Sequence, residues 1–325
     1  MSNRDLSCQE RRGSFAGALK SGVTAAQYGK IAPANTINYL SGGNPNLRPQ
    51  IADTVTAGLV LTPFESTHSL YLSADYWRIK INKYIGSLPP GPTFLNCLNS
   101  GNPLYCALVQ RDAAGSLSAG NGGNAGKVIA TGINTGSFEM SGIDLAGHYI
   151  LDTSRLHLGS AGNITFTFTG SIALDNKIET TPGQKADCTG YFGQFCTGAG
   201  PTSPVPKWRH KLRTTWEPTD GFETSINWRH IGHLDSEHLS SNPLLASTTA
   251  YSIDSRVAAY DYLDLDVGFA VGSHVNLRAG VNNLLDRQPP IVGFVANPQL
   301  VNGNMLAGIY DVFGRYLFVG VTAKY

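Results

Sequence analysis

The alternation of hydrophobic and polar residues is clearest between Tyr260 and Asn283, where two runs flank Gly272-Ser273-His274. Because strand side chains point alternately to opposite faces, the two runs predict an antiparallel hairpin with one apolar and one polar face. The apolar face carries Leu263, Leu265, Val267, Phe269, Val271, Val275, Leu277, Ala279 and Val281. Strands of about ten residues with two such faces are typical of strands that cross a bilayer, whereas strands of soluble sandwiches are usually shorter.

Seven further segments follow the same rule or extend it, so the pattern predicts nine strands in all. The clearest of the others is Ile164–Leu174, in which Ile164, Phe166 and Phe168 alternate with hydroxyl residues. In the second strand the alternation breaks at Trp77-Arg78, which indicates a bulge. The nine predicted strands are Thr54–Leu61, Leu70–Ile81, Phe138–Ile150, Ile164–Leu174, His210–Trp216, Phe222–Arg229, Tyr260–Val271, Val275–Asn283 and Arg315–Tyr325.

The connections between these strands alternate strictly between short and long. The short ones are 62–69, 151–163, 217–221 and 272–274, and the long ones are 82–137, 175–209, 230–259 and 284–314. Bacterial membrane barrels place short turns on the periplasmic side and long loops outside. We therefore expect an all-β, antiparallel transmembrane barrel. Since single-chain bacterial barrels have an even number of strands and leave no open edge in lipid, nine strands predict the C-terminal part of a larger barrel.

Composition changes this picture little. The 325 residues carry a net charge of +1, and only 14% are charged, which argues against a nucleic-acid partner. Residues 1–50 have no clear period; we expect an irregular, extracellular, loop-like segment with a helical turn around Ala16–Lys20, followed by the barrel portion at 51–325. The chain begins without a signal peptide, and an outer-membrane protein needs one, so we expect a missing N-terminal part.

Four of the five cysteines form two close pairs in polar loops. Cys97 and Cys106 are nine residues apart, and Cys188 and Cys196 are eight apart. Such pairs favour short disulfides in an oxidising compartment. A four-thiolate zinc site is the alternative, although its usual spacing is shorter. Cys8 is left over, either paired with a residue of a missing segment or present as a free thiol.

Several motifs resemble those of TonB-dependent outer-membrane receptors, in order and spacing, over about residues 40–325. The similar segments are Gly43–Pro49 (GNPNLRP), Asp75–Ile79 (DYWRI), Ser141–Leu145 (SGIDL), Val281–Pro290 (VNNLLDRQPP) and Tyr310–Val321 (YDVFGRYLFVGV). The resemblance implies a 22-stranded barrel filled by an N-terminal plug that contacts TonB, of which about the last nine strands are present and the plug absent.

The resemblance also implies the partners and the location. These are the bilayer of the outer membrane of a Gram-negative bacterium, the TonB complex through the missing plug, a small-molecule ligand, and the barrel-assembly machinery. The machinery would recognise Gly320, Ala323 and Tyr325 in the last strand. The ligand stays open among siderophores, vitamins, haem and oligosaccharides, and no enzyme activity is implied.

Other candidate chemistry is weaker. His230, His233, Asp235, Glu237 and His238 are close in sequence, but without helical spacing they are more typical of a polar loop than of a metal site. The Gly120–Gly126 stretch is expected to be a flexible loop. The charged residues of the polar face are expected to form salt bridges in the lumen, although paired carboxylates also perform acid–base catalysis; they are Arg213, Arg229, Asp264, Asp266 and Arg278.

The leading hypothesis is therefore active uptake of a scarce ligand across the outer membrane. A passive porin-like channel and an outer-membrane hydrolase are the alternatives, and a soluble β-protein is the simplest competing fold. No residue is assigned to catalysis, to a cofactor, to a metal or to substrate binding, and no cofactor is expected.

Overall fold

The computed structural model describes residues 15–31, 37–63, 69–118, 125–153, 162–181, 183–198, 204–219, 221–246, 255–293, 305–306 and 308–323. The chain divides into two compact units: unit 1 is Met1–Ile51, Lys83–Gly136 and Thr180–Pro182, and unit 2 is the remainder. The predicted domain boundary at residue 50 stays a prediction. No helix in the described part of the chain is long and apolar enough to cross a membrane.

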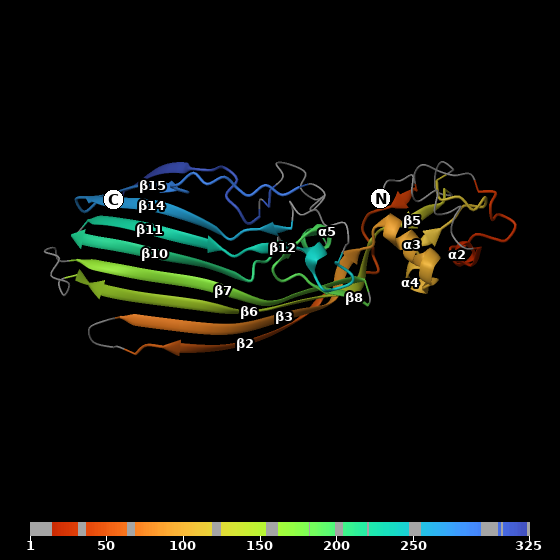
Figure 1. Cartoon of the computed structure of the whole chain (residues 1–325), viewed down its shortest axis with the longest axis horizontal. Helices are drawn as coiled ribbons and strands as arrows, with labels where there is room; N and C mark the ends of the chain where they lie inside the picture. Colours follow the sequence, from red (N-terminus) through yellow and green to blue (C-terminus); the bar gives the residue numbers. More distant parts are fainter. Residues whose placement is uncertain are drawn as a thin grey trace. The chain divides into compact units, whose positions relative to one another are not determined.

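The main sheet confirms all nine predicted strands. Each strand lies beside its sequence neighbour in the order β16-β15-β14-β11-β10-β7-β6-β3-β2, and β8 (Gln184–Asp187) pairs with β7 (Figure 1). From β6 to β16 every successive pair is antiparallel. The strands are β2 (Ile51–Leu61), β3 (Leu70–Ser87), β6 (Gly132–Asp152), β7 (Asn163–Thr181), β10 (Trp208–Thr219), β11 (Phe222–Ile231), β14 (Tyr260–Val271), β15 (Val275–Asn282) and β16 (Tyr316–Ala323).

The connections of this sheet alternate between short and long, as predicted. We call the two ends of the strands the short-turn end and the long-loop end. Three strands are longer than expected at the long-loop end: β3 ends at Ser87, β6 begins at Gly132, and β7 ends at Thr181. Their extensions have too few apolar residues to show an alternation; in that of β7 the single apolar residue, Ile178, is fully buried.

The register between β6 and β7 shifts between Ser141 and Gly142, where Leu174 of β7 is left without a partner. A β-bulge of this kind bends one strand and increases the local twist. β3 runs without interruption through Trp77 and Arg78, and the bulge expected there stays a prediction.

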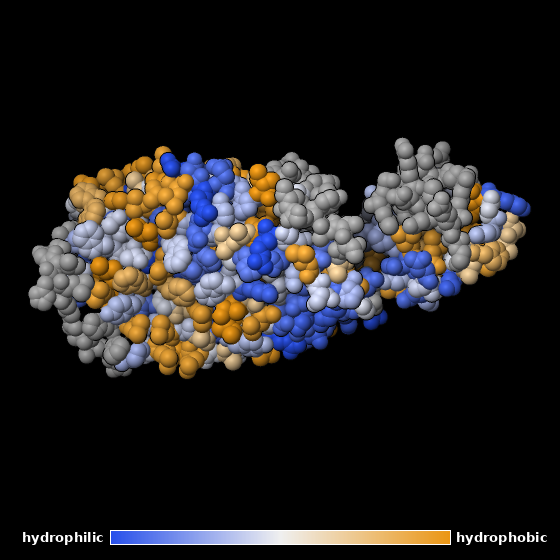
Figure 2. Space-filling model, in the orientation of Figure 1, coloured by the Kyte–Doolittle hydropathy of each residue, from blue (hydrophilic) through white to orange (hydrophobic). Residues whose placement is uncertain are grey.

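Side-chain exposure in the sheet is the reverse of that in a soluble protein. On β14, Phe269 is 53% exposed, whereas Asp264, on the other face, is only 6% exposed. Leu265 pairs with Ile226 on one side and with Val281 on the other, so the apolar face continues across neighbouring strands. Residues of high hydropathy also gather over the strands near the short-turn end, and hydrophilic ones gather toward β8 (Figure 2). This distribution favours contact of the apolar face with lipid.

Unit 1 contains short elements that are held together by a disulfide. It has three helices, α2 (Phe15–Lys20), α3 (Pro90–Ser100) and α4 (Pro103–Cys106), and a small sheet of β1 (Tyr39–Leu40), β5 (Lys127–Ile129) and β4 (Val109–Gln110). Cys97 of α3 and Cys106 of α4 form the first predicted disulfide. α2 confirms the expected helical turn at Ala16–Lys20. α3 ends at Gly101, whose φ of +66° is left-handed and therefore suits glycine.

The long connections of unit 2 also form a folded layer. It contains β9 (Tyr191–Phe192), α5 (Gln194–Gly198), β12 (Leu234–Ser236), η2 (Glu237–Leu239) and β13 (Arg256–Val257). Cys188 and Cys196 form the second predicted disulfide. The buried carboxylate of Glu237 accepts hydrogen bonds from the N–H groups of Phe195 and Cys196 at the start of α5. Both predicted disulfides are therefore confirmed, whereas Cys8 lies outside the described residues.

A charge on the apolar face should be far more costly than the same charge on the polar face. We predict that Ile226→Arg lowers the free energy of folding into bilayer vesicles by about 2–4 kcal/mol, because the side chain would meet hydrocarbon. The matched control is Thr215→Arg, because Thr215 lies on the polar face next to Thr214, the residue that pairs with Ile226. This variant should change the free energy of folding by less than about 1 kcal/mol. Denaturant titration in vesicles measures both variants; equal losses would mean that Ile226 does not face lipid.

The polar face of the sheet as the candidate functional site

The centre of the polar face is the guanidinium group of Arg229. It donates two hydrogen bonds to Asp264, 2.8 and 2.9 Å long, and two to Asp311, 2.9 and 2.6 Å long. It also lies 4.7 Å from the centre of the Tyr262 ring, whose hydroxyl accepts a hydrogen bond from the N–H of Asp311. Arg229 and Tyr262 are on the sheet, while Asp311 is on the connection before β16, so this network ties a long loop to the barrel wall.

A second ion-pair group lies nearer the short-turn end. Asp266 accepts a 2.9 Å hydrogen bond from Nε of Arg278, and Nη2 of Arg213 lies 3.8 Å from its carboxylate. The five charged residues expected to form salt bridges on the polar face therefore do so. Because Arg278 is about half exposed, this group is much wetter than the one around Arg229.

The turn after β15 is held by hydrogen bonds of its own side chains. Asn283 and Asp286 have left-handed backbone conformations, with φ of 53° and 52°. The Asn283 side chain bonds both the N–H and the carbonyl of Arg287, and Asp286 accepts from the N–H of Arg315. The N–H of Asn283 donates to Asp264, which connects this turn to the Arg229 network.

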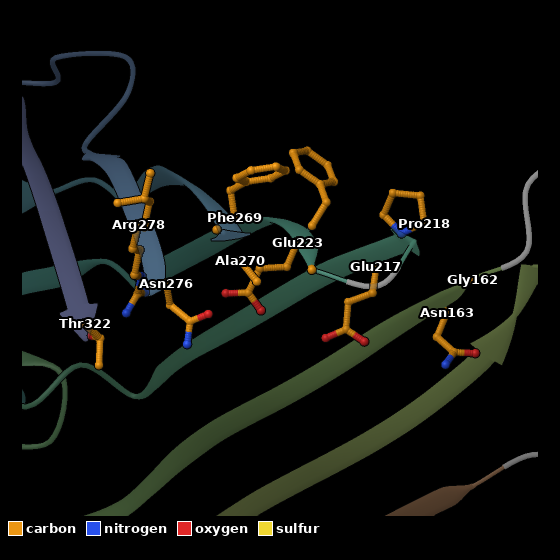
Figure 3. A pocket seen from close by; sticks show the side chains of 14 residues that line it. Gly162, Asn163, Glu217, Pro218, Glu223, Phe269, Ala270, Asn276, Arg278 and Thr322 are labelled. Atoms are coloured by element: carbon orange, nitrogen blue, oxygen red, sulfur yellow. The ribbon is translucent and has the colours of Figure 1, made fainter. Parts of the chain in front are cut away.

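The short-turn end has a cavity of about 900 Å³ on this face. The side chains of Glu217, Glu223 and Asn276 extend toward the same side of the strands (Figure 3). Neither glutamate makes a side-chain hydrogen bond or ion pair with another described residue. The cavity is therefore acidic, since Arg278, which also lines it, is neutralised by Asp266.

The long-loop end has a second cavity, of about 830 Å³, whose lining contains more basic side chains than that of the first. Arg209, Lys211 and Arg229 line it, together with Asp75 and Asp144 from other strands. Unlike Arg229, neither Arg209 nor Lys211 forms a side-chain hydrogen bond or ion pair with any residue that the structure describes. This cavity therefore carries charges of both signs, and Arg209 and Lys211 are its cations without an ion-pair partner among the described residues. These cations were not predicted as a group, although they follow the pattern Arg-x-Lys-x-Arg at 209–213.

The five candidate metal ligands do not converge on one point. His230 pairs with Asp261, Asp235 binds Arg256, and Glu237 caps α5; Nε2 of His233 lies 3.8 Å from Asp235, and Nδ1 of His238 is buried without a partner. In the described part of the chain, no group of three or more such residues could hold a metal ion. The hydrogen bond to Asp235 raises the pKa of Arg256, which is exposed. Most of Gly120–Gly126, together with Tyr325, lies outside the described residues.

A buried cluster of apolar and aromatic residues lies under the loops of unit 2. Its members are Phe192, Leu234, Val257, Tyr262, Val292, Leu306 and Tyr310. The hydroxyl of Tyr310 is buried and has no hydrogen-bond partner among the described residues, and burial raises the pKa of Tyr310 to about 12. The cluster therefore contains one tyrosine with a satisfied hydroxyl, Tyr262, and one without.

The two ion-pair groups should differ in their contribution to stability. We predict that Arg229→Gln destabilises unit 2 by about 3–5 kcal/mol, because it leaves two carboxylates without their partner. The matched substitution Arg278→Gln should cost about 1 kcal/mol or less, since that pair is solvated. Denaturant titration of the chain in detergent micelles measures both. Similar costs for the two variants would show that burial does not set the strength of these pairs.

The two buried tyrosines provide a second matched comparison. Tyr262→Phe should lower the free energy of unfolding by about 1 kcal/mol, because the N–H of Asp311 loses its acceptor. Tyr310→Phe should leave it unchanged or raise it, because an unsatisfied hydroxyl is removed.

Since the raised pKa favours neutral Tyr310 in the folded state, the contribution of Tyr310 to stability is complete below about pH 10 and is lost as the pH rises toward 12. Tyr310→Phe should therefore weaken the loss of stability in that range, measured by thermal unfolding, and a steeper loss would contradict this assignment.

Comparisons with known proteins agree with this architecture. The family model described as "TonB dependent receptor-like, beta-barrel" matches residues 9–284. A search of the curated proteins finds none that matches.

Solved structures with a similar fold include a mutant of the ferric enterobactin receptor PfeA from Pseudomonas aeruginosa, at 15% identity and a TM-score of 0.52 over 88% of this chain and 32% of that one. The siderophore receptor PirA from Acinetobacter baumannii is 14% identical, with a TM-score of 0.51 over 88% of this chain and 33% of that one. The chain thus spans about a third of the length of these receptors. With its nine-stranded antiparallel sheet and its family match, it belongs to the TonB-dependent receptor family and forms part of the receptor β-barrel.

Proposed function

We propose that this chain is the C-terminal part of the barrel of a receptor in the outer membrane of a Gram-negative bacterium, which takes up a scarce ligand by active transport. The observation that carries the proposal is the reversed exposure of the sheet, with apolar side chains outward and an ion-paired polar face inward. That distribution suits a wall with lipid on one side and an aqueous lumen on the other.

The ligand class follows from relatives and stays a proposal. PfeA has been solved in complex with enterobactin, and PirA is named a siderophore receptor. Ferric siderophores are thus the first candidates for this chain, with vitamins, haem and oligosaccharides after them. In this proposal the long loops face the outside and capture the ligand, and residues 1–50 belong to the extracellular side.

The partners follow from the same proposal. Energy would come from the TonB complex through a plug segment, and the last strand would be recognised by the barrel-assembly machinery. Gly320 and Ala323 lie on β16, as such recognition requires. The bilayer is the remaining partner, and nucleic acid is not one.

Uptake in the native bacterium tests the proposal. We expect cells without the gene to lose accumulation of one labelled candidate, with ferric siderophores measured first and then cobalamin, haem and oligosaccharides. A protonophore should abolish the same accumulation in wild-type cells, because transport depends on the energised inner membrane. Uptake that resists the protonophore would instead indicate a passive channel, and hydrolysis of an ester or peptide probe by the purified protein would indicate an enzyme.

A further inference from the structure

Strand β10 carries three cations on the polar face, at alternate positions. They are Arg209, Lys211 and Arg213, and successive members are about 6.6–6.8 Å apart along the strand, since each residue advances it by 3.3–3.4 Å. We call these three residues the cation ladder. It begins at the long-loop end, beside the cavity of about 830 Å³, and runs toward the middle of the strand.

The neighbouring strand β7 adds a hydroxyl to every rung. Ser171 pairs with Arg209, Thr169 with Lys211, and Thr167 with Arg213. Each rung therefore joins a positive charge to a hydroxyl that can donate a hydrogen bond, which is a combination suited to the oxygens of carboxylates and phosphates. Ser171 already donates to Asp144, whereas Thr169 makes no side-chain hydrogen bond with another described residue.

The described residues of the sheet provide no ion-pair partner for Arg209 or Lys211. Other cations on the same sheet have close carboxylates: Arg229 binds Asp264, Arg278 binds Asp266, and Arg78 binds Glu139. On the ladder, by contrast, Arg213 alone has a carboxylate of a described residue within 4 Å, that of Asp266 at 3.8 Å.

The surroundings of the middle rung strengthen this contrast. Asp144 is on β6, two strands away from β10, which is about 10 Å at 4.7–4.9 Å per strand. On its other side, Lys211 stands directly opposite Arg229 of β11. Arg229 is already bound to Asp264 and Asp311, so of these two opposite cations only Lys211 has no ion-pair partner among the described residues.

We propose that the cation ladder binds a solute with two or more anionic oxygen groups, carboxylates or phosphates, whose spacing matches successive rungs. This inference rests on the proposed function only in making the polar face the wall of the ligand's path. Arg209 and Lys211 bind the anionic groups by charge-assisted hydrogen bonds, and Thr169 donates the neutral hydrogen bond of the middle rung. A solute with a single anionic group engages one rung and binds more weakly.

Equilibrium binding to the full chain in detergent micelles at low salt tests the ladder. The probes are citrate and inorganic tripolyphosphate, with acetate as the probe that has one anionic group. We expect the double variant Arg209→Gln/Lys211→Gln to weaken citrate binding at least tenfold, and Thr169→Val to weaken it about threefold without a change in charge. Acetate should bind at least tenfold more weakly than citrate to the wild type.

The matched control removes two positive charges that already have carboxylate partners. In Arg256→Gln/Lys185→Gln the lost ion pairs are those with Asp235 and Glu139, and citrate affinity should stay within twofold of the wild type. An equal loss in both double variants, no loss in the ladder variant, or acetate binding as tightly as citrate would overturn the proposal.

Chemical acetylation of the wild type provides a measurement that needs no variant to fold. Citrate should protect the Lys211 amine severalfold, read by mass spectrometry, while the amine of Lys185 stays unprotected. Absence of protection at Lys211 would also overturn the ladder. Neither experiment involves energised transport, so their failure would leave the uptake proposal standing, and loss of energised uptake would leave these binding results unchanged.

Discussion

The backbone hydrogen bonds of the sheet are the constraint from which the rest of the structure follows. Within a bilayer no water replaces a missing hydrogen bond, so a strand must be paired along its whole membrane-spanning length. The continuous antiparallel register from β6 to β16 provides that pairing. Once the strands are paired, every second side chain faces lipid and must be apolar, and the charged residues are confined to the other face.

Because the charged residues share one face, each is neutralised by its neighbours on that face, and the way in which this happens differs along the strands. Around Arg229 the solution is a pair of bidentate carboxylates, one of them supplied by the connection before β16. The same network therefore stabilises the wall and fixes a loop against it. Around Asp266 the two cations are wetter, and solvent takes a larger part in screening their charges.

The strands and their faces could be predicted from sequence because both follow from period-two alternation, and the salt bridges followed from the faces. The extensions of β3, β6 and β7 could not be predicted, since each has too few apolar residues to show a period of two. α3 and α4 were missed because a long, Gly- and Pro-rich connection hides short helices that depend on a disulfide. The cation ladder could not be predicted as a unit because the expected strand began at His210, which left Arg209 outside it, whereas β10 begins at Trp208.

The charges along the polar face also bear on the choice between an energised receptor and an open channel. Among the described residues, Arg209 and Lys211 have no ion-pair partner at the long-loop end, where Asp75 and Asp144 line the same cavity, and Glu217 and Glu223 have none at the short-turn end. An anion attracted to the first region is repelled by the second, because the two act on it with opposite sign in a space where screening is weaker than in bulk water. Such an arrangement concentrates an anionic solute near the loops and opposes its passive escape toward the other end. A passive anion channel would gain nothing from carboxylates at the short-turn end, so this arrangement of charges differs from the one that a simple anion pore needs.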